Sequence, residues 1–561
     1  MCMYNTWYGK CLIFSIAICA IVTVAQSLHA AWPANGVPVC VDAADQQSPQ
    51  IVTDGAGGAI IMWVDMRNGQ TDLYVQRIDG EGNALWTPDG KPVVYPTEPQ
   101  EEAQMVSDGA EGVLITWRID QAATHGDIFA QKIDSNGNGL WSLGGVPVCT
   151  NDYVQLRPRI ASDGAGGAII VWEDLRDDYQ YKAYAQRLDA SGAPLWIADG
   201  IPLCPDSTGQ QYLQITPDGS GGAIVAWEDW RSGTESNIYA QRVYSNGFLL
   251  WGSSGVAVCT ADYNQPRPRG CSDGSQGAIL AWWDYRDFPF RSIYAQRIDA
   301  SGTTRWTTNG VGVVDYGGSH NAFCIGSDGS GGAIIVFDDL HDIMAQRFDP
   351  NGIRLWTDNG ATICNLGSNQ TSPHLTPDGA GGAIFTWDDD RSGNQDIYAQ
   401  HLDGDGVERW VTNGVPLCDT TEHQRVPRIV SDGTGYAICT WQDSRTGTNW
   451  DIYAQHQSYV ATGVMPEVPE AFFLAQNFPN PFNPQTVIRF GLAEPGHVSL
   501  RVYDIAGRLV RVLVDEDREA GAHDEIWNGF GSNGRAVASG IYFYKLEAGT
   551  FIRTKKMVLM K

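Results

Sequence analysis

The sequence predicts an all-β chain built from a four-stranded unit that occurs eight times. The first observation is an aromatic residue that recurs in one register, at spacings of 54, 55, 55, 55, 55, 50 and 54 residues: Trp63, Trp117, Trp172, Trp227, Trp282, Phe337, Trp387 and Trp441. The second is that helical periodicity is absent, while glycine-containing turn signals separate short apolar runs. Such a repeat indicates a repeat architecture.

Each repeat is expected to form four strands. In the third repeat, residues 157–162 are expected to form the first strand, which an Asp-Gly turn follows. Residues 168–174 are expected to form the second strand, which is apolar on both faces. A polar loop, often with the pattern Asp-x-Arg, leads to the third strand at 183–189. The segment "LWIADGIPLC" (195–204) is expected to be the fourth strand.

The two ends of the repeat region complement each other. The eighth repeat contains "AICTWQD" (437–443) and "DIYAQHQ" (451–457) but lacks the fourth-strand motif, which occurs instead as "AWPANGVPVC" at 31–40. A ring needs such a join to remove its open strand edges, whereas a solenoid does not. We therefore predict an eight-bladed β-propeller over residues 31–462, closed by an N-terminal outer strand.

Residues 1–30 have the composition of a secretory signal peptide. Lys10 precedes the short apolar stretch "CLIFSIAICAIVTVA", and small residues follow before Ala31. We expect no transmembrane segment in the mature chain, since no later stretch is long and apolar enough. The net charge of -28 disfavours nucleic acid as a partner.

The repeated polar residues predict structure rather than catalysis. A glutamine series (with His320 in the sixth repeat) and the Asp-x-Arg loops recur many times, whereas catalysis needs one asymmetric constellation. Six cysteines share one repeated position and are expected to be small buried residues: Cys40, Cys149, Cys204, Cys259, Cys364 and Cys418. No CxxC pair, HExxH motif or phosphate loop occurs, so we expect no catalytic residues, cofactor or metal.

Asymmetric arginines are the candidate ligand-binding residues. They enter the innermost strands of only three repeats: Arg157, Arg159, Arg267, Arg269, Arg425 and Arg428. A cationic patch near the channel mouth suits an anionic polysaccharide or another carboxylated ligand, and pairing with acidic loop residues is the alternative. The leading hypothesis is a binding module for carbohydrate or protein. The alternatives are a polysaccharide hydrolase or lyase and a structural surface scaffold.

The C-terminal region departs from the repeat after a Pro-containing linker at 463–471. Residues 472–561 alternate apolar and polar positions and predict a small β-sandwich. "QNFPNPFNPQTVIRF" (476–490), "VYDIAGRLVRVL" (502–513), "SGIYFYKLEAG" (539–549) and "TKKMVLMK" (554–561) resemble the C-terminal sorting domain of type IX secretion cargo. That domain is similar to the Ig-like domain of flagellar hook-capping proteins.

The resemblance implies a route and a partner for the chain. It implies export through the periplasm to the cell surface or the medium, directed by the type IX secretion machinery. Lys555, Lys556 and Lys561 belong to the matching terminal motif. The segment "WNGFGSNGRAV" (527–537) departs from the family, which often carries more acidic residues in this turn.

Overall fold

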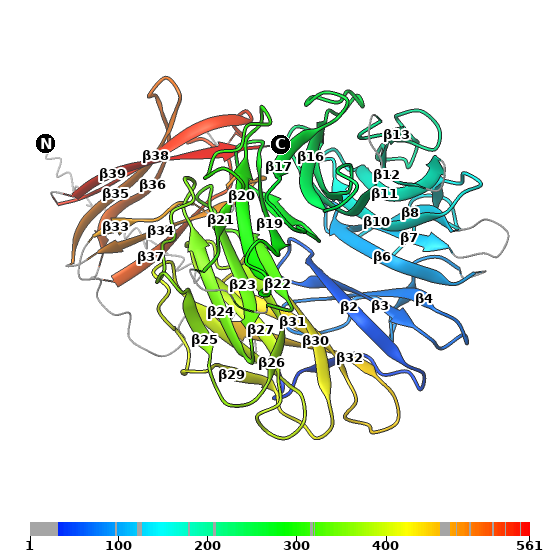
Figure 1. Cartoon of the computed structure of the whole chain (residues 1–561). Coiled ribbons are helices and arrows are strands. Elements are labelled where there is room, and N and C mark those ends of the chain that lie inside the picture. Colours follow the sequence, from blue (N-terminus) through cyan, green and yellow to red (C-terminus); the bar gives the residue numbers. More distant parts are fainter. Residues whose placement is uncertain are drawn as a thin grey trace, which may run out of the picture.

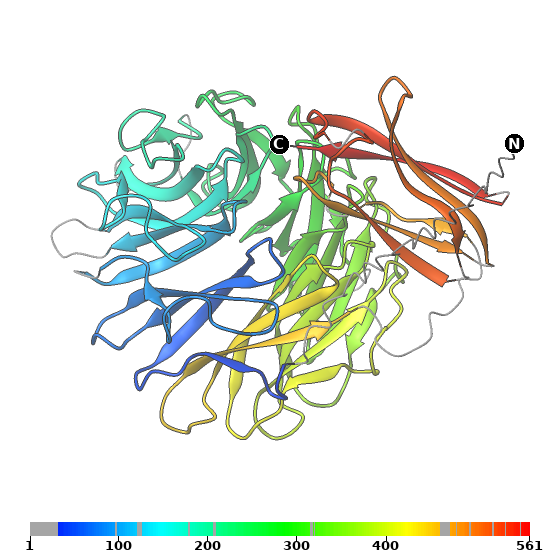
Figure 2. The same ribbon diagram turned by 180° about the vertical axis from the view of Figure 1, so that it is seen from behind.

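A computed structural model describes residues 32–95, 98–119, 126–177, 180–205, 209–314, 318, 320–459, 472–477, 480–492, 495–518, 521–532, 535–549 and 551–560. Every regular element among these residues is a β-strand. Figures 1 and 2 show opposite sides of the chain, with neighbouring four-stranded sheets in a circuit and β33–β39 to one side. The predicted signal peptide and the linker at 463–471 lie outside the described residues.

Four antiparallel sheets occupy the first half of the chain, each with its strands in sequence order. Sheet 1 contains β2 (Gln46–Thr53), β3 (Ala59–Asp65), β4 (Asp72–Ile78) and β5 (Lys91–Pro92). Sheet 2 contains β6 (Gln100–Ser107), β7 (Val113–Ile119), β8 (Asp127–Ile133) and β9 (Val146–Cys149). Sheet 3 contains β10 (Gln155–Ser162), β11 (Ala168–Asp177), β12 (Gln180–Leu188) and β13 (Ile201–Pro202). Sheet 4 contains β14 (Gln210–Pro217), β15 (Ala223–Asp229), β16 (Asn237–Val243) and β17 (Val256–Cys259).

Four more antiparallel sheets follow. Sheet 5 contains β18 (Arg269–Ser272), β19 (Ala278–Asp284), β20 (Ser292–Ile298) and β21 (Val311–Gly312). Sheet 6 contains β22 (Phe323–Ser327), β23 (Ala333–Asp339), β24 (Asp342–Phe348) and β25 (Ala361–Cys364). Sheet 7 contains β26 (Gln370–Pro377), β27 (Ala383–Asp389), β28 (Asp396–Leu402) and β29 (Val415–Cys418). Sheet 8 contains β30 (Gln424–Ser431), β31 (Tyr436–Asp443), β32 (Asp451–Ser458) and, outermost, β1 (Val37–Cys40).

The two ends of the repeat region join in sheet 8. β1 pairs antiparallel with β32, with Val37 opposite Ala454 and Cys40 opposite Ile452. The N-terminal fragment therefore supplies the outermost strand of the eighth sheet, as the sequence predicts.

Neighbouring sheets share apolar cores. Trp172 of sheet 3 packs in one cluster with Leu114 and Ile128 of sheet 2, and it is fully buried. Trp63 of sheet 1 likewise packs with Val39 of β1, so sheets 8 and 1 share a core as the other neighbours do. Second strands such as β15 are buried along their whole length, because both faces of each sheet are covered.

The fourth strands are shorter than the sequence predicts. Each of these strands contains only two to four of the last four residues of its motif, as in β9 and β13. The tryptophan of the motif precedes the strand and binds the next sheet: Trp141 donates through Nε1 to the backbone oxygen of Ala190, at 3.1 Å. The first part of the motif therefore contacts the next sheet, and only its last part forms a strand.

The C-terminal strands form two sheets around one core. β33 (Phe473–Leu474), β34 (Thr486–Leu492) and β37 (Gly521–Trp527) make a three-stranded sheet. The four-stranded sheet has the order β36 (Leu509–Arg518), β35 (Gly496–Asp504), β38 (Gly540–Ala548) and β39 (Phe551–Leu559). Phe490 and Trp527 of the first sheet pack with Leu500 and Tyr544 of the second, which makes a β-sandwich.

Candidate functional site: an arginine-lined central cavity

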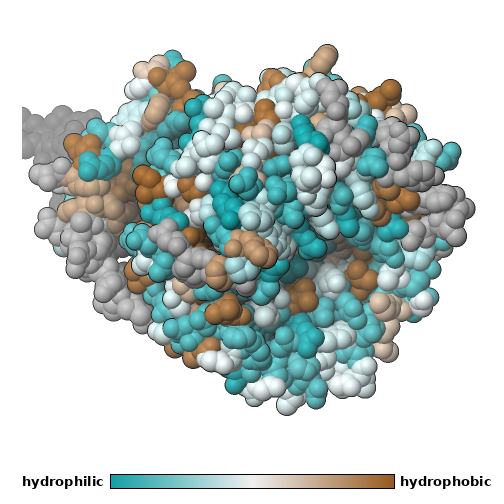
Figure 3. All heavy atoms as spheres, in the orientation of Figure 1, coloured by the Kyte–Doolittle hydropathy of each residue, from teal (hydrophilic) through white to brown (hydrophobic). Residues whose placement is uncertain are grey.

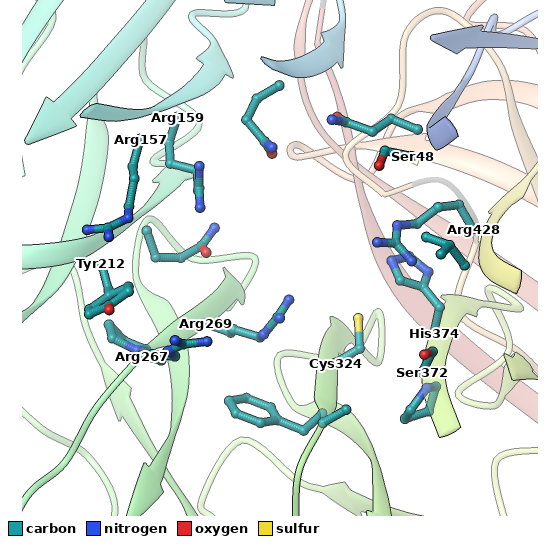
Figure 4. A pocket seen from close by; sticks show the side chains of 18 of the residues that line it. Ser48, Arg157, Arg159, Tyr212, Arg267, Arg269, Cys324, Ser372, His374 and Arg428 are labelled. Carbon is teal, nitrogen blue, oxygen red and sulfur yellow. The ribbon is translucent and has the colours of Figure 1, made fainter. Parts of the chain in front are cut away.

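A cavity of about 890 Å³ lies among the first strands of sheets 1–8 (Figure 4). Its wall contains residues from, or directly before, each of these strands: Ser48, Pro49, Gln50, Ile51, Gln104, Arg157, Arg159, Tyr212, Leu213, Gln214, Arg267, Pro268, Arg269, Ala322, Phe323, Cys324, Ser372, Pro373, His374, Val426 and Arg428. Because eight repeats contribute one strand each, residues far apart in sequence meet here.

One repeat position forms a ring in this wall, which we call the inner ring. It has the same spacings as the buried aromatic series and consists of Gln50, Gln104, Arg159, Gln214, Arg269, Cys324, His374 and Arg428. Since the spacing is conserved along the chain while the residue type varies, the ring is symmetric in geometry and asymmetric in chemistry.

A strained residue two positions before the inner ring shapes the wall. It has positive φ in seven repeats, none of them glycine: Ser48, Glu102, Arg157, Tyr212, Arg267, Ser372 and Val426. In β10 the pairing register shifts between Leu156 and Arg159, as in a bulge. Left-handed backbone at such residues costs free energy and persists where the surroundings enforce it.

Carboxylates of the preceding sheet stabilise this strained backbone. Glu173 of sheet 3 accepts a hydrogen bond from the backbone N–H of Tyr212 at 2.7 Å, and Glu228 of sheet 4 accepts one from that of Arg267 at 3.3 Å. Glu173 and Glu228 are buried, and neither is among the residues that line the cavity. These acidic residues therefore have a structural role behind the wall.

Five of the six predicted arginines line the cavity. Arg157 and Arg267 occupy the position of Tyr212 in the repeats before and after it. Their guanidinium carbons lie 4.7 Å and 4.9 Å from the centroid of the Tyr212 ring. Arg157 also forms an ion pair with Glu173 at 2.7 Å. Arg159, Arg269 and Arg428 belong to the inner ring.

Arg425, the sixth predicted arginine, is not among the residues that line the cavity. Its guanidinium carbon lies 5.9 Å from the ring centroid of Trp450. In the repeat register Arg425 aligns with Leu156, and Val426 aligns with Arg157. Leu156, at the position equivalent to Arg425, is likewise absent from the wall, so a one-residue offset separates Arg425 from the lining positions.

The inner ring carries the positive charges of three arginines, Arg159, Arg269 and Arg428. Among the described residues, no carboxylate forms an ion pair with Arg159, Arg269 or Arg428, and the lining residues include no aspartate or glutamate. Arg159 and Arg428 each donate through Nη1 to the carbonyl of the preceding proline. Burial lowers the pKa of both guanidinium groups, and the charge of Arg269 adds to this effect. The carboxylates of Glu173 and Glu102 oppose it at Arg159, and that of Asp388 opposes it at Arg428. The arrangement favours an anion between these side chains.

The Asp-x-Arg loops are structural, as expected. Arg176 pairs with the buried Asp174, which also accepts a hydrogen bond from the indole Nε1 of Trp172 at 2.9 Å. Arg176 donates as well to the sulfur of Cys149, in the last strand of the preceding sheet. Five further cysteines each accept a hydrogen bond from the arginine of an Asp-x-Arg segment: Cys40, Cys204, Cys259, Cys364 and Cys418.

These cysteines are therefore more than the small buried residues that the sequence suggested, because each accepts a hydrogen bond from an arginine. The equivalent positions before sheets 2 and 6 are Val94 and Val314. Those two sheets also lack the Asp-x-Arg pattern. Cysteine and arginine are thus present together or absent together.

Sequence reasoning missed Tyr212, Cys324 and His374 as cavity residues. Their signal was available, because Cys324 and His374 have the same spacing as the arginines of the inner ring. Only residues of the same type were compared between repeats, so unlike residues at the same repeat position were overlooked.

The terminal motif lies on the edge strand β39. Lys556 is exposed, whereas Lys555 is half-buried and burial lowers its pKa. Lys561 lies outside the described residues. The rest of the surface is mainly hydrophilic on the face in Figure 3, with scattered apolar side chains.

Residues 481–550 match the family model of the FlgD Ig-like domain. This match supports an Ig-like fold for the C-terminal sandwich. Comparison with curated proteins gave no match. No helix capable of crossing a membrane occurs among the described residues.

Three solved structures illustrate what the chain resembles. A protein of unknown function from Dyadobacter fermentans is 11% identical, with 54% of this chain and 94% of that chain covered and a TM-score of 0.32. The α-L-arabinanase of Penicillium chrysogenum is 10% identical, with 76% and 98% covered and a TM-score of 0.31. The fucose-specific lectin of Aleuria aurantia is 13% identical, with 56% and 94% covered and a TM-score of 0.31. None of these likenesses assigns a function to this chain.

Proposed function

We propose that the chain is an exported eight-bladed β-propeller that binds a carboxylate-bearing ligand, with an acidic oligosaccharide as the first candidate, in its central cavity. The observation that carries this proposal is the absence of carboxylate partners for Arg159, Arg269 and Arg428 within the described residues. These three guanidinium groups line one cavity, and a ligand carboxylate supplies bidentate hydrogen bonds to them.

The proposed domain organisation follows the repeat and the terminal motifs. Residues 1–30 are the signal peptide, 31–462 the propeller with sheets 1–8 as its blades, 463–471 the linker and 472–561 the sorting domain. The type IX secretion machinery is the proposed partner, and the cell surface or the medium is the proposed destination. The quoted terminal motifs support this, together with the Ig-like match.

Calorimetric titration with an oligogalacturonate tests ligand binding. We expect binding that weakens with added salt, and no binding of a neutral oligosaccharide of the same length. Arg159→Gln and Arg269→Gln should each weaken the affinity about tenfold, since each removes a charge-assisted hydrogen-bonding group. Arg425→Gln is the matched control, because its side chain lies off the wall. Equal loss in the control, or binding that ignores charge, would count against the proposal.

A reporter fused to residues 464–561 tests export separately. In a cell with type IX secretion, the reporter should reach the surface or the medium. Retention in the periplasm would contradict the sorting assignment without affecting the cavity.

One observation favours a second candidate, a polysaccharide lyase. Tyr212 and His374 share the cavity with the arginines, whereas no carboxylic acid lines it within the part of the chain that the structure describes. A base beside a neutralised uronate is what β-elimination requires, while glycoside hydrolysis needs two carboxyl groups about the scissile bond. Formation of an unsaturated product from a uronic-acid polymer, lost in Tyr212→Phe, would identify this activity.

A further inference from the structure

Cys324 and His374 are neighbours in the inner ring. They lie in β22 and β26, the adjacent first strands of sheets 6 and 7. Figure 4 shows the sulfur of Cys324 directed into the cavity and the imidazole of His374 on the same side, near Arg428. Arg269 of the preceding strand extends toward them. A thiol, an imidazole and two guanidinium groups thus face one space.

The environment of Cys324 differs from that of the other described cysteines. Burial raises the pKa of Cys40, Cys149 and Cys439 to about 12. Burial also raises the pKa of Cys324, but the imidazole of His374 and the charge of Arg269 outweigh it and lower the pKa to about 6. Positive neighbours stabilise a thiolate, which is the reactive form of cysteine.

The imidazole of His374 follows Cys324 in the inner ring and also lines the cavity. Its Nδ1 is buried and has no hydrogen-bond partner within the described part of the chain. The charged or titratable groups around Cys324 come from three other first strands: Arg269 and Cys271 in β18, His374 in β26 and Arg428 in β30. Among the described residues this set contains no carboxylate that would oppose a thiolate.

We propose that Cys324 and His374 form a thiolate–imidazolium pair in the cavity wall, and that this thiolate is a nucleophile that forms covalent adducts with carboxylate-bearing electrophiles. The inference deepens the proposed function, since the arginines that bind a carboxylate also bring the electrophile to the sulfur. It adds a site of covalent reaction to a cavity for which the proposed function gives only non-covalent ligand binding.

The covalent step is a displacement. The sulfur of Cys324 supplies an electron pair, a sulfur–carbon bond forms and the bond from that carbon to the leaving group breaks. The leaving group departs with the electron pair of the broken bond. It takes the proton from His374 when it is more basic than imidazole, and the proton stays on the imidazole when it is not. Iodoacetate is the simplest such reagent, and iodide is its leaving group.

Competitive alkylation of the full-length folded protein tests the proposal. Iodoacetate and its neutral analogue iodoacetamide would be applied separately, and labelling of each cysteine would be followed by peptide mass spectrometry. We expect Cys324 to react at least about tenfold faster than Cys271 or Cys439, with a rate that rises around pH 6. The ratio of the iodoacetate rate to the iodoacetamide rate should be higher at Cys324 than for a free thiol in solution.

Two variants separate the contributions. His374→Gln should slow labelling at neutral pH about tenfold and move the midpoint of the rate profile toward that of an ordinary thiol. Arg269→Gln should reduce the preference for iodoacetate. Cys439→Ser is the matched control, because Cys439 is a buried cysteine of β31 that does not line the cavity, and it should change neither. Circular dichroism of each variant verifies that the fold is retained.

The outcomes distinguish this inference from the proposed function. Labelling of Cys324 with an ordinary thiol midpoint, or a midpoint unchanged by His374→Gln, would overturn the pair even if oligogalacturonate binds. A fast thiolate without preference for iodoacetate would overturn the claim about carboxylate-bearing electrophiles. Oligogalacturonate should protect Cys324 from either reagent, and a fast, selective thiolate without such protection would support the nucleophile while contradicting the oligosaccharide as the ligand.

Discussion

Arg176 donates through Nη2 to the sulfur of Cys149 at 3.1 Å, and this contact joins the end of β11 in sheet 3 to the last strand of sheet 2. The same arginine neutralises Asp174, which is fully buried. A charge pair and a sulfur contact thus hold neighbouring sheets together at a position far from the cavity.

Removing this arginine should destabilise the protein. Arg176→Ala leaves the charge of Asp174 buried without its partner, and we expect a loss of about 2–4 kcal/mol in the free energy of unfolding. Arg176→Lys should lose less, because it keeps the charge but not the forked geometry. Urea unfolding monitored by tryptophan fluorescence measures both. Unfolding of Arg176→Ala at the wild-type urea concentration would show that the network contributes no stability.

Deleting residues 31–40 should open the circuit of sheets. The edge of β32 would lose its partner β1 and expose unpaired backbone groups, and the core between sheets 8 and 1 would lose Trp32 and Val39. We expect a lower melting temperature and concentration-dependent association, measured by calorimetry and light scattering. The chain starting at residue 31 is the control. A truncated protein as stable and monomeric as this control would refute the role of β1 in closure.

Arg159→Gln should raise stability while it weakens anion binding. Burial and the neighbouring charges of Arg269 and Arg157 disfavour the guanidinium charge in the folded state, as the lowered pKa of Arg159 indicates. We expect a gain of about 1 kcal/mol without ligand, in keeping with functional residues that reduce stability. Thermal unfolding with and without oligogalacturonate checks both effects. A destabilised variant would indicate that Arg159 serves the fold instead.

The carboxyl group of Glu173 should make stability depend on pH. Burial raises its pKa from about 4.5 to about 7, although Arg157 and the N–H of Tyr212 attract its charge. Between these values the folded state holds the proton and the unfolded chain has released it, so stability falls as pH rises through this window. Relative to Glu173→Gln, the wild type should lose about 2 kcal/mol from about pH 4.5 to about pH 7. Parallel urea midpoints for the two proteins across this range would contradict the raised pKa.

Much of the architecture was predictable because it is encoded locally. The spacing of the aromatic series, the Asp-Gly turns and the doubly apolar second strands each depend on a few adjacent residues. The position of the motif at 31–40 was predictable, because the eighth repeat lacks the fourth strand that this motif supplies. The predicted lengths of the fourth strands were too great, because the tryptophans of these motifs pack between sheets and do not belong to the strands. Strand periodicity does not reveal such packing.

The sequence by itself determined that eight like units follow one another, that the first and last strands complete one sheet, and that the C-terminal region is a separate sandwich. Only the tertiary structure decided which side chains share the cavity. The left-handed residues at positions such as Arg157 and Tyr212 interrupt the alternation of side chains along the first strands, so strand periodicity alone does not show which of their residues line the cavity. Cys324 and His374 meet the arginines only because eight separate strands converge, and convergence is a property of the assembled sheets rather than of any one repeat.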